Sequence, residues 1–129
     1  MTQEQKDLLI KDLCGRLPYG VKVEYNGEKY KISNVSICNE TVTIYGERGY
    51  PMEVEIKKVK PYLFPLSSMT EEQYDQLYID SRVKNDSVDI LDALANDMDA
   101  IEYLLKNNFD IHGLIPIGLA NDATGLNIY

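Results

Sequence analysis

The stretch Val59-Lys60-Pro61-Tyr62-Leu63-Phe64-Pro65-Leu66-Ser67-Ser68-Met69-Thr70 separates two kinds of sequence. Before it, apolar and polar residues alternate as in β-strands, and after it apolar residues recur at helical spacing. Pro61 and Pro65 cannot donate to a sheet ladder, so regular strand pairing should end near residue 60. A flexible linker would be rich in Gly and Ser, and this stretch is rich in Pro, aromatic residues and Leu. We therefore expect a rigid, buried joint within one domain over residues 1–129.

Upstream of the joint, the first segment has the pattern of an amphipathic helix. Thr2 and Gln5 have the spacing of a capping box, in which each side chain bonds the backbone amide of the other residue. The sequence Leu17-Pro18-Tyr19-Gly20 should stop the helix, which we expect from about residue 3 to about residue 15. Its apolar face is formed by Leu9, Ile10, Leu13, Cys14 and Leu17.

Between this helix and the joint, the sequence predicts an antiparallel meander. Asn26-Gly27 is a strong signal for a tight hairpin, because both residues tolerate positive φ. Ser33-Asn34 predicts a bulge or bend within the return strand. So few strands would form a small SH3-like barrel or a twisted sheet of four to five strands. The expected strand runs are 21–25, 29–37, 41–45 and 52–59.

Downstream of the joint, the sequence predicts a helical subdomain. Thr70 and Gln73 repeat the capping-box spacing at the start of a helix over about 70–80. Ser87 can cap a longer helix over about 87–106, and Asp110 a short one through Ile115. We thus expect an α+β fold, with a helix and β part over residues 1–66 and an acidic helical part over 67–129.

Charge is distributed unevenly along the 129 residues, whose formal net charge is −8. Residues 1–65 carry a net charge of +1, and residues 66–129 a net charge of −9. The second part would repel nucleic-acid phosphates, so direct nucleic-acid binding is disfavoured and a basic protein surface is the favoured partner. Homo-oligomerisation stays open. No window reaches the roughly 20 apolar residues of a membrane span, and two cysteines without C-x-x-C spacing fit reduced thiols in a cytoplasm.

Two groups of residues are candidates for binding a partner. The predicted helix over 87–106 presents a row of carboxylates, which could mimic a phosphate backbone or simply form the solvated face of an amphipathic helix. Three tyrosines lie among strand lysines, where they could form a binding surface on the sheet or belong to half-buried strands. The candidates are Asp89, Asp92, Asp99 and Glu102 in the first group and Tyr25, Tyr30 and Tyr45 in the second.

The sequence contains no recognisable catalytic, metal-binding or cofactor-binding motif. Asp110-x-His112 could form an oriented base, but no nucleophile can be placed beside it. The run Asp97-x-Asp99-x-x-Glu102 lies inside a predicted helix and lacks the glycine turn of a calcium loop. Gly46-Glu47-Arg48-Gly49 does not match a phosphate-binding loop. We expect no enzyme and no cofactor.

Several segments resemble one protein family. They are Met1-Thr-Gln-Glu-Gln-Lys-Asp-Leu-Leu, Cys14-x-Arg16-Leu17-Pro18-Tyr19-Gly20-Val21, Lys60-Pro-Tyr-Leu-x-Pro-Leu-Ser-Ser-Met-Thr-Glu-Glu and Phe109-Asp110-x-x-Gly113-Leu114-Ile115-x-x-Gly118-Leu119-Ala120. Together they look like small proteins of unknown function carried by phages and mobile elements of gut Bacteroidales. The resemblance implies a bacterial cytoplasm and an accessory role, and it transfers no activity, cofactor or catalytic residue.

These observations favour a non-enzymatic module that binds a host or phage protein. The alternative is a protein that binds or sequesters a small nucleotide signal, with tyrosines and lysines of the sheet as its contacts. A third hypothesis, an enzyme that uses Asp110 and His112, depends on a partner residue that the sequence does not identify.

Overall fold

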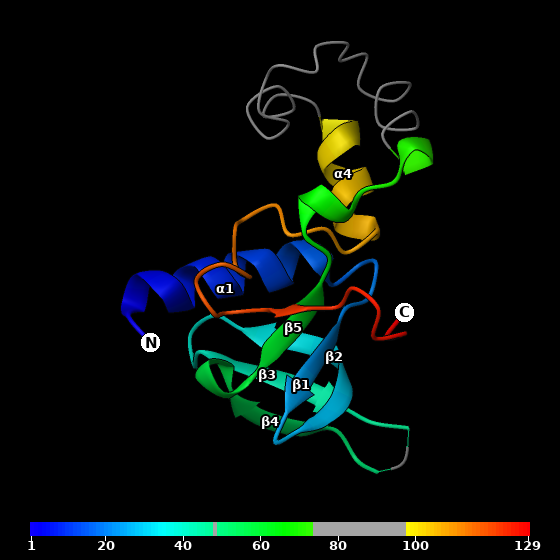
Figure 1. Cartoon of the computed structure of the whole chain (residues 1–129). Coiled ribbons are helices and arrows are strands. Elements are labelled where there is room, and N and C mark those ends of the chain that lie inside the picture. Colours follow the sequence, from blue (N-terminus) through cyan, green and yellow to red (C-terminus); the bar gives the residue numbers. More distant parts are fainter. Residues whose placement is uncertain (48, 74–97) are drawn as a thin grey trace.

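The computed structural model describes residues 1–47, 49–73 and 98–129 and has an α+β fold (Figure 1). An N-terminal helix precedes the strands, and a second described helix follows the joint. The elements are α1 (Gln3–Arg16), β1 (Lys22–Tyr25), β2 (Glu28–Ser36), β3 (Thr41–Tyr45), β4 (Met52–Glu55), the 3-10 turn η1 (Ile56–Lys58), β5 (Lys60–Leu63), the 3-10 turn η2 (Leu66–Ser68), α4 (Met98–Lys106) and β6 (Asn121–Asp122).

Both expected capping boxes are present. At the start of α1, the Gln5 amide donates to Thr2 Oγ1 (3.1 Å) and the Thr2 amide donates to Gln5 Oε1 (3.0 Å). At Thr70, the Gln73 amide donates to Thr70 Oγ1 (3.2 Å), and the Thr70 amide donates to Gln73 Oε1 (2.8 Å). Each box satisfies a backbone amide that the first helical turn leaves unpaired.

The strands form one open sheet with the order β4-β3-β2-β1-β5-β6. Strands β1 to β4 pair antiparallel, as their alternation predicts. Strand β5 also pairs antiparallel with β1, with Pro61 opposite Val23, so the expectation that strand pairing ends near residue 60 is wrong. The strand expected over 52–59 ends at Glu55, where η1 begins. Asn26 and Gly27 adopt positive φ (51° and 81°) in the tight turn that joins β1 to β2. The register shifts between Ile32 and Asn34, at the expected bulge.

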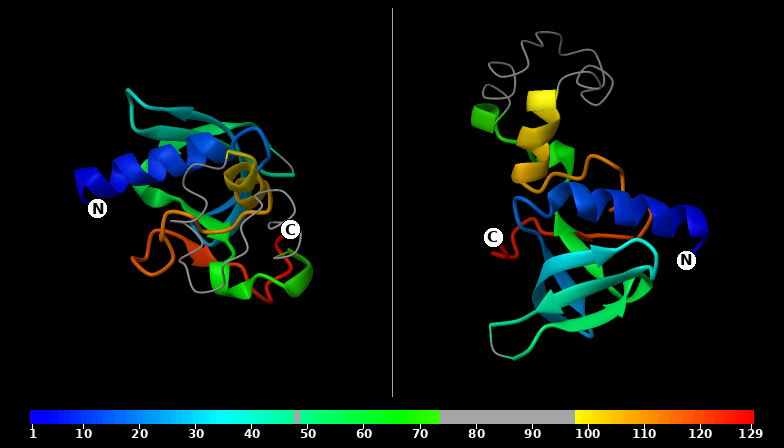
Figure 2. Two further views of the ribbon diagram at one scale, coloured as in Figure 1. Left: turned by 90° about the horizontal axis from the view of Figure 1, so that it is seen from above. Right: turned by 180° about the vertical axis from the view of Figure 1, so that it is seen from behind.

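Helix α1 covers one face of the sheet, and α4 lies on the far side of α1 (Figures 1 and 2). Apolar residues of α1 and the inward-facing residues of the strands form the main core, in which Leu9, Leu13 and Val23 have no exposed surface. A second cluster joins α4 to the joint through Met69, Leu104 and their neighbours. A third cluster, formed by Tyr62, Ala123 and Ile128, includes residues of β5 and of the C-terminal segment.

The joint is fixed by backbone hydrogen bonds to the C-terminal segment. The Phe64 amide donates to the Asn108 carbonyl (2.8 Å), and the Asp110 amide donates to the Phe64 carbonyl (2.8 Å). The Ala123 amide donates to the Leu63 carbonyl (2.8 Å). Pro61, Tyr62 and Leu63 of the joint are buried and Phe64 is half-buried, and the rigidity of the joint stays a prediction.

The structure differs from the sequence expectation in the sheet and in the third helix. Strand β6 pairs parallel with β5, so the sheet is mixed and has six strands rather than four or five. The described strands do not close into a barrel, because β4 and β6 are the two edges of the sheet. Residues 110–115 form turns rather than a short helix. Most of the helix expected over 70–80, and the first half of that over 87–106, lie outside the described residues.

Truncation of a residue in the joint should destabilise the fold strongly. Leu63 has no exposed surface and packs in the main core, so Leu63→Ala should lower the free energy of unfolding by about 2–5 kcal/mol. Leu126→Ala is the matched control, because Leu126 is 51% exposed and should change stability by less than about 0.5 kcal/mol. Urea unfolding would measure both, and equal losses would contradict the buried joint.

Candidate functional site

A charged pair is buried where α1 meets the C-terminal segment. Asp12 and Arg16 lie one helical turn apart, and neither has exposed surface. Arg16 Nε donates to Asp12 Oδ1 (2.6 Å), and Arg16 Nη2 donates to Asp12 Oδ2 (3.0 Å). Arg16 Nη2 also donates to the Phe109 carbonyl (2.6 Å). Arg16 Nη1 is buried with no hydrogen-bond partner among the described residues. The other bonds offset part of the cost of burying the two charges, and they link α1 to residue 109.

His112 joins this pair rather than Asp110. Its Nδ1 lies 2.7 Å from Asp12 Oδ2, and the His112 side chain is 21% exposed. Asp110 instead accepts hydrogen bonds from the backbone amides of Leu114 (2.8 Å) and Ile115 (3.0 Å). The hypothesis of an Asp110–His112 base is therefore wrong in its pairing, because Asp110 stabilises a turn and Asp12 orients the imidazole.

Two opposing effects set the pKa of Asp12. Burial of the carboxyl raises its pKa, whereas the hydrogen bonds from His112 and Arg16 and their positive charges lower it. The lowering effects prevail, so the pKa of Asp12 lies below its ordinary value of 3.8. The carboxylate is therefore more stable in the folded protein than in the unfolded chain.

A groove of about 430 Å³ opens beside the joint and the end of α4. Its aromatic side chains come from three distant segments, and the rings of Phe64 and Phe109 have centroids 6.3 Å apart. Phe64 also lies 5.9 Å from the ring of Tyr129. The described lining residues are Phe64, Ser68, Thr70, Gln73, Lys106, Asn107, Asn108, Phe109, Thr124, Gly125 and Tyr129.

Tyr129 lines the groove and has a buried hydroxyl. Its hydroxyl donates to the Tyr62 carbonyl (2.7 Å) and accepts from the Lys22 backbone amide (2.9 Å). Burial of this hydroxyl raises the pKa of Tyr129 to about 12, although 47% of the residue is exposed. Lys22 Nζ lies 5.7 Å from the centroid of the Tyr129 ring.

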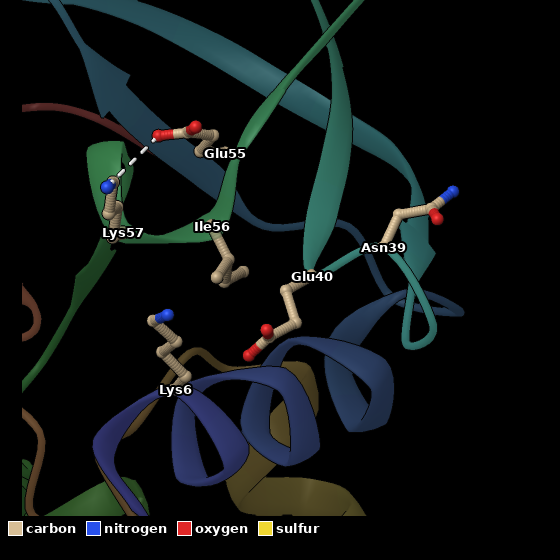
Figure 3. A pocket seen from close by; sticks show the side chains of 6 residues that line it. All are labelled: Lys6, Asn39, Glu40, Glu55, Ile56 and Lys57. Carbon is tan, nitrogen blue, oxygen red and sulfur yellow. Dashed lines mark ion pairs between the residues drawn. The ribbon is translucent and has the colours of Figure 1, made fainter. Parts of the chain in front are cut away.

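A second, smaller pocket lies between α1 and the sheet (Figure 3). Its volume is about 140 Å³, below the range of roughly 300–1,000 Å³ that is typical of ligand sites. Lys6 and Lys57 oppose Glu40 and Glu55 around it, so its charges cancel. Glu40 also accepts a hydrogen bond from the Gln3 side chain (2.9 Å). This pocket is better explained as a gap between packed elements than as a site.

The three candidate tyrosines do not share one face of the sheet. Tyr30 lies opposite Val23, a core residue, and Tyr25 packs edge-on against Tyr30 with ring centroids 6.1 Å apart. Tyr45 lies opposite Lys31, whose side chain is exposed. Because opposed residues point to the same face, Tyr45 lies on the other side of the sheet. The proposed tyrosine surface would therefore have to involve both faces.

The acidic candidates are described only in part. Asp89 and Asp92 lie outside the described residues, and Asp99 lies in the first turn of α4. Glu102 is exposed and accepts a hydrogen bond from the Tyr19 hydroxyl (2.8 Å), which raises the pKa of Tyr19. Glu102 therefore also connects α4 to the end of α1, and the binding role of this group stays a prediction.

A feature that the sequence analysis did not single out is the edge at β4. Tyr50 is 95% exposed, and Met52, the first residue of β4, is 38% exposed. No described strand pairs with the outer side of β4. The available signal was an aromatic residue between Gly49 and Pro51, in a loop where nothing demands an apolar side chain.

Other features add no chemistry to these sites. Cys14 and Cys38 are free thiols, and burial raises the pKa of Cys14. Within residues 1–47, 49–73 and 98–129, no cluster of three or more His, Cys, Asp or Glu could hold a metal ion. In the same ranges, no helix has the length and apolar character needed to span a membrane.

Comparison with known proteins identifies no relative, since no family model, no curated protein and no solved structure matches the chain. The sites above must therefore be interpreted from their own geometry.

Removal of one member of the buried pair should strongly destabilise the fold. Asp12→Asn leaves the Arg16 charge uncompensated, so it should lower the free energy of unfolding by about 3–5 kcal/mol. The double variant Asp12→Leu/Arg16→Met should recover part of that loss, because two apolar residues need no pairing. Urea unfolding would measure all three proteins. A single variant as stable as the wild type would contradict the role of the pair.

The pair should also make stability depend on acid pH. Because the folded-state pKa of Asp12 is lowered, its contribution is complete above about pH 4 and is lost as the pH falls through the folded-state value. The difference in unfolding free energy between wild type and Asp12→Asn should therefore shrink below that pH. Asp7→Asn, at an exposed position of the same helix, should follow the wild-type curve. A constant difference down to the acid transition would contradict the linkage.

Proposed function

We propose that the chain is a non-enzymatic module that binds another protein through the edge of its sheet at β4. One observation carries this proposal: Tyr50 is 95% exposed beside the edge strand β4, whose outer side pairs with no described strand. Tyrosine is enriched among the residues that dominate binding energy at protein interfaces. A nearly fully exposed tyrosine next to the open edge of a sheet is a natural anchor for a partner.

The backbone of β4 can accept an additional strand. The Ile56 amide donates to the Glu40 carbonyl (2.9 Å), so these residues form a hydrogen-bonded pair. Bonded and non-bonded pairs alternate in an antiparallel ladder, and Glu55 and Glu53 therefore direct their backbone groups away from β3. An extended peptide of a partner can pair with these groups by strand addition.

The charges near this edge favour a basic partner segment. Glu47, Glu53 and Glu55 are all exposed around β4. Glu55 already lies 3.5 Å from Lys57, while no described residue forms an ion pair with Glu47 or Glu53. Lysine or arginine on an incoming strand could pair with Glu53, which forms no ion pair within the described residues, and opposite charges across a strand pair stabilise it.

Within this proposal the chain acts in a bacterial cytoplasm, as an accessory protein of a phage or mobile element. That setting follows from the resemblance of its terminal and joint segments to proteins of Bacteroidales phages. The proposal also treats residues 1–129 as one domain.

Site-specific photo-crosslinking would test the edge. A photoreactive phenylalanine analogue at position 50 should capture a defined protein in host cells, since that side chain would lie within the interface. The same analogue at position 11, an exposed site on α1, is the matched control and should capture little. Mass spectrometry would identify the captured peptide, which should be extended and basic.

A second variant separates the interface from folding. Glu53→Pro removes an outward-directed amide, and it should abolish capture while α1 and the main core stay folded by circular dichroism. Capture that is equal at positions 50 and 11, or that survives the proline, would contradict strand addition at β4.

A further inference from the structure

We propose that the groove beside the joint binds a small molecule that combines a planar ring with an anionic group. Its volume of about 430 Å³ lies within the range of roughly 300–1,000 Å³ that is typical of small-molecule sites. The groove is separate from β4, because its residues come from the joint, the end of α4 and the C-terminal segment.

The aromatic walls select a planar ring. The ring centroid of Phe64 lies 6.3 Å from that of Phe109 and 5.9 Å from that of Tyr129, and all three residues line the groove. Phe109 is only 2% exposed, so the aromatic residues that a ligand can reach are Phe64, which is half-buried, and Tyr129, which is 47% exposed. The hydrogen bonds of the Tyr129 hydroxyl hold that residue in place. Aromatic pairs prefer offset or edge-to-face geometry, which a ligand ring can adopt against such walls.

Lys106 selects a negative charge. It is the one charged side chain among the described lining residues, it is exposed, and it forms no ion pair with the part of the chain that the structure describes. Thr70 and Thr124 add hydroxyl groups to the same lining. In a chain of net charge −8, a groove whose described lining carries a single positive charge is distinctive, and a carboxylate or phosphate matches it.

The side chain of Asn108 offers a hydrogen-bond acceptor to the ligand. Asn108 lines the groove, and its Oδ1 is buried with no hydrogen-bond partner in the part of the chain that the structure describes. Its backbone has a φ of 61°, and its amide donates to the Leu105 carbonyl, so the residue is fixed at the end of α4. An unpaired buried acceptor is costly, and a ring nitrogen or exocyclic amine that reached it would remove that cost.

Calorimetric titration of the full chain with four probes would test the proposal. AMP and indole-3-acetate each combine a ring with an anion, and at least one should bind with a Kd below about 1 mM. Adenosine and inorganic phosphate carry only one of the two features, and each should bind at least tenfold more weakly. A preference for AMP would identify a nucleotide, and a preference for indole-3-acetate an aromatic carboxylate.

Two variants connect binding to the groove. Lys106→Gln should weaken the preferred probe at least tenfold, whereas Lys11→Gln, which removes an exposed charge on α1, should not change its Kd. Thr124→Trp should fill the groove and abolish binding, with circular dichroism to confirm that each variant is folded.

Failure of both ring-anion probes to bind at about 1 mM would overturn the proposal. Equal affinity for phosphate alone, or equal loss in the two lysine variants, would also overturn it.

Discussion

The structure depends on one buried ion pair. Asp12 and Arg16 have no exposed surface, and their bonds extend to the Phe109 carbonyl and to His112, about a hundred residues away in the sequence. Taking two charges out of water costs several kcal/mol for each ion, and their mutual hydrogen bonds offset that cost only where the geometry is right. Misplacement of α1 relative to residues 109–112 would break the pairing. Correct placement of the two chain ends is therefore a condition for burying the pair.

Hydrogen bonds from the joint hold the same C-terminal segment that the buried ion pair contacts. Phe64 exchanges backbone hydrogen bonds with residues 108 and 110, and Leu63 accepts one from Ala123. Residue 109 is thus held by the sheet through its neighbours and by α1 through Arg16. The C-terminal segment is consequently integrated with β5 rather than appended to it, which explains how the two-residue strand β6 can pair with a central element of the fold.

Local chemistry explains which features could be predicted from sequence. Capping boxes at Thr2 and Thr70 and the turn at Asn26-Gly27 depend on residues three or fewer positions apart, and all three form as expected. Strand β6 could not be predicted, because Asn121 and Asp122 have poor strand propensity and pair only where β5 offers a free edge. The partner of His112 was equally hidden. Its one signal was an Asp and an Arg at i, i+4 on the turns that carry Leu9 and Leu13, where charge is unexpected.

The hydrogen bonds that hold the chain ends together also fix residues that line the groove. The ring of Phe64 packs against Phe109, whose carbonyl accepts from Arg16, and against Tyr129, whose hydroxyl is bonded to the backbone of β1 and β5. Side chains fixed in this way lose little further freedom on binding, so more of the contact energy remains as affinity.

The edge at β4 differs from the groove, because no contact of this kind with another described residue fixes Tyr50, which is almost fully exposed. A partner that binds there must order the Tyr50 side chain, whereas a ligand in the groove meets side chains that are already ordered. The two surfaces lie near opposite edges of the sheet, so occupation of one need not exclude the other.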